Sequence, residues 1–183
     1  MFRTLTGLLG LVAILAAVGC EAVYMAEPIG GRPETFDMSQ LEGTWHVEED
    51  AVLIKVTDPD EGRFVAAGIQ DEDGTLTLRL LEFAVREVNR WHLLQVRTEE
   101  DDPARSWSLV GRLTSVDNNG AVLVPLDTSK VIDLVRSGDL PGTVGERNAV
   151  LGELTDEHLN RLTDEKQELL FLWDQPQHIR KLK

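Results

Sequence analysis

Sulfur, basic charge and long apolar runs are all scarce in this chain. Its 183 residues include one cysteine, and 18 Lys and Arg stand against 32 Asp and Glu, a formal net charge of -14. One cysteine excludes an internal disulfide framework. The negative field repels nucleic-acid phosphates and anionic lipid headgroups, so we expect no nucleic-acid binding. Fifteen glycines and seven prolines, without a period, exclude a collagen-like chain. What is present, 42% hydrophobic residues, fits one ordinary globular domain.

The N-terminus carries the longest apolar run. Arg3 is followed by mostly apolar residues from Leu5 to Val18 and then by small residues before Cys20. This run is shorter than the ~20 residues that a spanning helix needs. The layout is that of a secretory signal peptide. We therefore expect residues 1–19 to be a signal peptide, and no permanent transmembrane helix.

Residues 17–20, Ala-Val-Gly-Cys, resemble the lipobox of bacterial lipoproteins, although Ala17 stands where Leu is more common. The resemblance implies a mature chain that starts at Cys20, whose thiol receives the lipid. Acyl chains anchor a protein firmly without a spanning segment. By the same resemblance, Glu21 after the cysteine favours the outer membrane, facing the periplasm, if the envelope is Gram-negative. The alternative is an ordinary cleaved signal, with Cys20 a small buried residue.

The remaining chain divides into two parts. Residues 20–40 contain Pro28, Pro33 and the pair Gly30-Gly31 with little periodicity, which predicts a flexible tether. Residues 41–183 form the single globular domain. Removing residues 1–19 takes away Arg3 and no acid, so 17 bases face 32 acids and the mature net charge is -15.

From residue 44 to 127, short runs rich in Val, Ile, Leu and Trp alternate with turn clusters, which predicts an antiparallel meander of six or seven strands. Asp117-Asn118-Asn119-Gly120 is the clearest hairpin turn. Residues 75–84 alternate leucine with polar residues, as a half-buried strand does. Asp71-Glu72-Asp73-Gly74 fits the turn before it.

The pattern then changes to a helical period. Residues 127–129 offer N-caps to a helix that ends at Gly138, and residues 155–157 cap a second one. The triplet Thr-Asp-Glu recurs at 163–165, either as another cap or within a continuing helix. Residues 148–151 suggest one more strand. The sequence thus predicts an α+β fold in which an antiparallel meander, as an open sheet or partial barrel, packs against two or three C-terminal helices.

No catalytic or metal constellation is visible in the sequence. The histidines, His46, His92, His158 and His178, form no metal-binding pair, and no serine lies in a Gly-x-Ser-x-Gly elbow. The acidic clusters fit turns and solubility, and none matches a calcium loop. We expect no catalytic residue, no metal and no cofactor, and therefore not an enzyme.

Three tryptophans, Trp45, Trp91 and Trp107, lie on expected strands and are the candidate ligand-binding residues. Residues 41–45, Leu-Glu-Gly-Thr-Trp, resemble the Gly-x-Trp opening of lipocalins. This resemblance implies a barrel whose tryptophans face a cup for a small apolar ligand. The chain departs from that family in its second C-terminal helix and in the tether before the motif. The alternative is that the tryptophans only pack in the core.

Two functional hypotheses follow. Residues 122–127 and 138–142 resemble a recurring tail of uncharacterised bacterial lipoproteins, which implies localisation but no activity. The first hypothesis is a membrane-anchored, non-catalytic module that binds another envelope protein, marked by an exposed apolar patch or an open sheet edge. The alternative is a lipocalin-like carrier of a small apolar ligand, marked by a closed barrel with an internal cavity.

Overall fold

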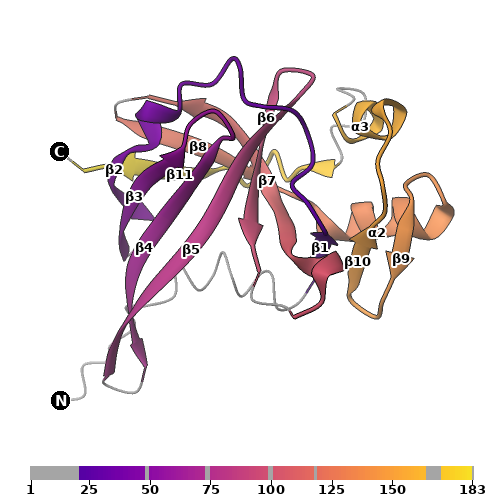
Figure 1. Cartoon of the computed structure of the whole chain (residues 1–183), viewed down its shortest axis with the longest axis horizontal. Coiled ribbons are helices and arrows are strands. Elements are labelled where there is room, and N and C mark those ends of the chain that lie inside the picture. Colours follow the sequence, from indigo (N-terminus) through magenta and orange to yellow (C-terminus); the bar gives the residue numbers. More distant parts are fainter. Residues whose placement is uncertain are drawn as a thin grey trace.

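The fold is a β-barrel with a smaller α/β layer against one wall (Figure 1). The computed structural model describes residues 21–47, 50–72, 75–98, 101–117, 119–163 and 170–182. The strands are β1 (Ala22–Met25), β2 (Gly43–Val47), β3 (Asp50–Asp58), β4 (Arg63–Glu72), β5 (Thr75–Val88), β6 (Trp91–Arg97), β7 (Trp107–Val116), β8 (Gly120–Pro125), β9 (Gly142–Val144), β10 (Asn148–Leu151) and β11 (Gln177–Lys181). The helices are α2 (Thr128–Ser137) and α3 (Asp156–Leu162), with 3₁₀ turns η1 (Met38–Leu41) and η2 (Pro103–Arg105).

The predicted meander is confirmed as β2 to β8, and it closes. Each of these strands pairs antiparallel with the next. β11 then enters antiparallel between β8 and β2 and completes a ring of eight strands. The open sheet or partial barrel that we expected is therefore a full barrel, because the C-terminal strand seals the gap that β2 and β8 would leave.

A second layer covers the outer wall at β7. β1 pairs with β7 and runs parallel to β10, which in turn pairs with β9. α2 begins after Asp127 and ends at Gly138, whose φ of +83° is the left-handed cap that glycine favours. Thr155 caps α3 as predicted. Of the second Thr-Asp-Glu triplet, residues 164 and 165 lie outside the described residues.

The N-terminal segment differs from expectation. We predicted a flexible tether over residues 20–40, but β1 is a buried strand, with Val23 fully covered and Tyr24 only 7% exposed. After β1 the chain passes over one mouth of the barrel, bridges to Glu87 at Gly31, and ends in η1 (Figure 1). Pro and Gly content signals irregular backbone, but four apolar residues suffice for a strand when β7 and β10 offer both edges.

Two hydrophobic cores lie on opposite sides of the barrel wall. The inner core fills the barrel with residues such as Val52, Phe64 and Phe83. The outer core lies between the wall and the second layer, around Val23, Leu109 and Val131. Since successive side chains of a strand point to opposite faces, β6 supplies Leu94 to the inner core and Leu93 to the outer one. In the part of the chain that the structure describes, no helix is long and apolar enough to span a bilayer.

Candidate functional site

The three candidate tryptophans do not share one site. Trp45 points into the barrel, is 1% exposed, and donates from Nε1 to the Leu41 carbonyl oxygen at 2.6 Å. Trp91 and Trp107 belong to the outer core instead. The Arg112 guanidinium lies 3.8 Å from the centre of the Trp91 ring, a cation–π geometry that buries the ring between protein groups. Of the three tryptophans that the carrier hypothesis offered as cavity-facing, the structure therefore places Trp45 in the barrel interior and the other two in the outer core.

The barrel holds an apolar cavity of about 70 Å³. Its lining includes Trp45, Phe64, Phe83, Leu94 and Leu123. An engineered cavity of about 150 Å³ accommodates benzene, and drug-sized ligands occupy roughly 300–1,000 Å³. The barrel interior is thus mostly filled by its own side chains.

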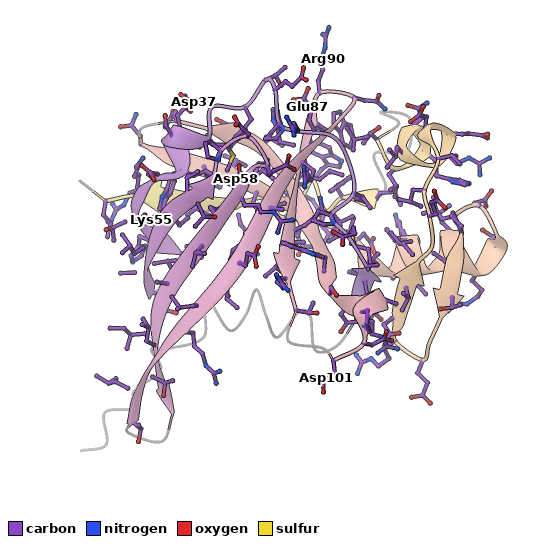
Figure 2. All side chains as sticks on the ribbon, viewed as in Figure 1. Asp37, Lys55, Asp58, Glu87, Arg90 and Asp101 are labelled. Carbon is purple, nitrogen blue, oxygen red and sulfur yellow. The ribbon has the colours of Figure 1, made fainter. Side chains whose placement is uncertain are left out.

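A polar pocket of about 350 Å³ lies at the mouth of the barrel under the N-terminal segment. Thr35 donates its backbone N–H and its hydroxyl to the Glu87 carboxylate, at 3.0 and 2.9 Å. The Nε2 atom of His92 lies 3.0 Å from the same hydroxyl oxygen. Figure 2 shows Glu87 and Asp37 at this end of the barrel, and Asp101 at the other.

The Thr35, Glu87 and His92 side chains hold the N-terminal segment against the barrel and lack the geometry of a catalytic relay. Burial lowers the pKa of His92 below its ordinary value; the Glu87 carboxylate opposes that shift and the Arg112 charge adds to it. In a nucleophile–histidine–acid relay, the acid holds the ring nitrogen that is remote from the nucleophile. Here the Glu87 carboxylate and the His92 Nε2 atom converge on the Thr35 oxygen itself. The arrangement fixes the N-terminal segment to the barrel, and the hydroxyl proton is committed to Glu87.

The other histidines lie apart from this mouth. His46 pairs with Ala51 and Arg180 in the sheet, His158 completes the cap of α3, and His178 is exposed on β11. Within the described ranges, no group of three or more His, Cys, Asp or Glu side chains gathers as metal ligands would.

The most unusual surface is an apolar face on the outer wall of β3, β4 and β5. Five large side chains there are between 54 and 71% exposed. They form what we call the leucine face: Leu53, Ile69, Leu76, Leu78 and Leu80. Ile69 lies opposite Leu78, and Ala67 lies between Leu53 and Leu80 in the register, so all five share one side of the sheet. Monomers seldom expose a contiguous apolar patch of this kind without a partner.

The leucine face lies mostly on a ribbon of two strands that leaves the barrel. β3 pairs with β4 only as far as Ala67, and β6 pairs with β5 only from Phe83 onward. Figure 1 shows the tip of β4 and β5 projecting beyond the other strands. A two-stranded hairpin is marginally stable by itself in water. Both its apolar side and its edges therefore suit it to contact with another molecule.

The sequence predicted this strand but not the exposure of its leucines. The alternation over residues 75–84 predicted a half-buried strand, and Leu81 and Phe83 are indeed buried. Leu76, Leu78 and Leu80 are exposed instead, because no described element covers that wall. No family model, no curated protein and no solved structure matches this chain.

Proposed function

We propose that this protein is a lipid-anchored lipoprotein of the cell envelope, with the lipid on Cys20, which binds another envelope protein through the leucine face and catalyses no reaction. The observation that carries the proposal is the set of five apolar side chains, each more than half exposed, on one wall. Covering them releases roughly 1 kcal/mol apiece. That sum is at the low end of the cost of association, about 4–15 kcal/mol, so docking needs further contacts.

The position of the anchor favours a protein over a bilayer as the occupant. Counted round the ring of eight strands, β3 lies four places from β7, β4 three and β5 two. β1 is paired to β7, and one residue, Glu21, separates it from Cys20. Two residues span at most about 7 Å, so a lipid on Cys20 holds the β7 side near the membrane. The strands of the leucine face then lie two to four places round the barrel from that side, where a protein can reach them.

Carriage of a small apolar ligand remains the second candidate, because the barrel is closed and Trp45 faces its interior. A cavity of about 70 Å³ limits such a ligand to a few heavy atoms unless side chains move. A native mass spectrum of the purified protein separates the two functions. The bare mass of the lipidated chain supports the docking function, and a reproducible added mass of a few hundred daltons, lost in Trp45→Ala, supports the carrier.

Photo-cross-linking in intact cells tests the docking function directly. A photoreactive amino acid at position 78 lies in the leucine face, and one at position 77 lies on the opposite side of the same strand as the matched control. We expect position 78 to yield a cross-link to one identifiable envelope protein that position 77 does not, and Leu76→Asp to abolish it. Equal products from both positions, or products with lipid alone, would refute the proposal.

A further inference from the structure

We infer that the partner docks by adding an extended strand to the free edge of β5, along Thr75–Leu81, so that its alternate apolar side chains continue the leucine face. This inference rests on the proposed function and specifies how the same site binds. It supplies the further contacts that the leucine face needs, since each main-chain hydrogen bond to an added strand contributes to affinity.

The direction of the backbone groups along β5 is set by its bonds with the chain on its β4 side. The Val85 N–H donates to the Gly62 carbonyl oxygen at 2.9 Å, and Glu87 exchanges two such bonds with Gly31. The β4–β5 register then runs without a shift from Arg63 opposite Ala84 to Glu72 opposite Thr75. Odd-numbered residues of β5 therefore direct their N–H and C=O toward β4.

The even-numbered residues direct these groups the other way. From residue 84 onward, β6 takes them up. Before Phe83, no strand in the described part of the chain pairs with that edge. Leu76, Leu78 and Leu80 thus present both an exposed side chain and a main-chain donor and acceptor that no described strand pairs.

The edge also lacks the features that natural proteins use to block strand addition. Residues 75–81 read Thr-Leu-Thr-Leu-Arg-Leu-Leu, without proline, lysine or a bulge. Arg79 is the one charged residue in this segment, and its side chain lies on the opposite face of the strand from the leucine face. A segment of this composition, with high β propensity and little charge, is an aggregation hazard when left uncovered. Its retention is explained if a partner covers it.

The chemistry of the edge specifies the partner. An added strand that is apolar at every second position matches the leucine spacing. The Glu82 carboxylate is already paired with Arg63 and Arg97, at 2.8 and 3.0 Å. The chain without residues 1–19 has a net charge of -15, so its electrostatic field attracts positive charge. This charge favours a partner segment with basic flanks and disfavours a second copy of this chain.

Amide hydrogen exchange of the full-length lipidated protein in zwitterionic nanodiscs tests the inference. The probe is a synthetic peptide, Lys-Thr-Val-Thr-Val-Thr-Val-Thr-Lys, and its control has aspartate in place of valine. In the free protein we expect the amides of Leu76, Leu78 and Leu80 to exchange at least about tenfold faster than those of Thr77, Arg79 and Leu81. Saturating peptide should slow the first set about tenfold and leave the second unchanged. The control peptide should slow neither set.

Two variants distinguish the contribution of the residue 78 N–H from that of its side chain. Leu78→Pro removes the central edge N–H without removing a bond to β4, and proline is tolerated on such edges. Leu78→Val keeps both the N–H and an apolar side chain. We expect the proline variant to lose the protection and the valine variant to keep it, with the exchange pattern of the barrel core unchanged in both.

Each contrary result overturns the inference in its own way. Equal peptide binding by Leu78→Pro and Leu78→Val excludes strand addition but leaves the proposed function standing, provided that Leu76→Asp still abolishes the cellular cross-link. Edge amides that are protected without peptide, and lose protection on dilution, identify a second copy as the occupant. Protection that needs anionic vesicles identifies a bilayer and overturns the proposed function too.

Discussion

Gln95 is a buried polar residue that acts as a strand partner. It is 0% exposed; its Oε1 accepts from the Ile29 N–H at 2.8 Å, and its Nε2 donates to the Ile29 carbonyl oxygen at 3.0 Å. One side-chain amide thereby satisfies both main-chain groups of a residue in the N-terminal segment. Such a group is costly to leave unpaired once it is removed from water.

Gln95→Leu should therefore lower the free energy of unfolding by roughly 2–5 kcal/mol, since it keeps the volume but leaves two main-chain groups of Ile29 unpaired. Urea denaturation measures this loss. The control Gln175→Leu, at an exposed position, should change stability by less than about 0.5 kcal/mol. Equal effects of the two substitutions would contradict this role for Gln95.

Substituting two glycines distinguishes the cost of a steric clash from the cost of an unfavourable backbone conformation. Gly62 and Gly138 both have positive φ, +61° and +83°. A Cβ on Gly62 would lie 2.2 Å from the Val85 carbonyl oxygen, whereas one on Gly138 meets nothing within 4 Å. Gly138→Ala should cost about 1 kcal/mol from conformation alone, and Gly62→Ala several times that. Paired thermal or urea unfolding curves give both values, and similar losses would refute the clash.

His92 predicts how stability depends on pH. Burial lowers its pKa in the folded state, so the unfolded chain binds the proton more readily. The stability associated with the neutral ring is complete above the ordinary pKa of 6.5. It is lost as the pH falls from there through the folded-state pKa. His92→Gln should flatten the unfolding free energy over this range, and an unchanged slope would show that another group titrates there.

At the scale of elements, the sequence predicts that side chains alternate along each strand, but it does not predict which face of the strand another element covers. A period of two places neighbours such as Leu93 and Leu94 on opposite sides of a strand, and both sides are apolar here because both walls of β6 are buried. The sequence therefore could not tell whether Trp91 faced the barrel or the second layer. For Leu76 to Leu80, the same period suggested burial that no neighbouring element provides.

The short strands β1 and β11 were also not predictable from the sequence. β1 has four residues, and its parallel partner β10 begins more than 120 positions later, so no local pattern announces the pairing. β11 closes the barrel with Ile179 as its sole aliphatic residue, so its sequence carries little sign of a strand. Local signals were sufficient at the caps of α2 and α3, because a cap depends on residues within one turn of the helix.

The projecting ribbon of β4 and β5 should be dispensable for folding. Gly68 and Arg79 lie opposite each other, and Arg79 directs its main-chain groups toward β4, so an Asn-Gly turn can join them in place of residues 69–78. We expect the shortened protein to keep its unfolding free energy within about 1 kcal/mol, since few described contacts lean on the ribbon. A photoreactive amino acid at position 53, which the deletion retains, should cross-link the partner in the full protein and not in the shortened one. A large drop in stability would mean that the ribbon supports the barrel.

At the scale of the molecule, the barrel and its second layer form one body with two cores. Whether the barrel closes decides how its cavity is interpreted. The predicted meander did not reveal closure, since that depends on β11 entering between β8 and β2. Once closed, the interior is occupied largely by the protein's own side chains, and the surface that is left for binding is outside. The N-terminal strand joins β7, which lies two places from β5, three from β4 and four from β3 round the ring.

The seating of β1 also orders events in time. Its two neighbours, β7 and β10, end at residues 116 and 151, so β1 cannot be fixed in place until most of the chain has been made. One residue separates Cys20 from β1 in the sequence, so enzymes that carry out the proposed lipidation would have more chain to bind before β1 is paired than afterwards. Late pairing of an early strand would thus give the proposed acylation a time window that folding itself closes.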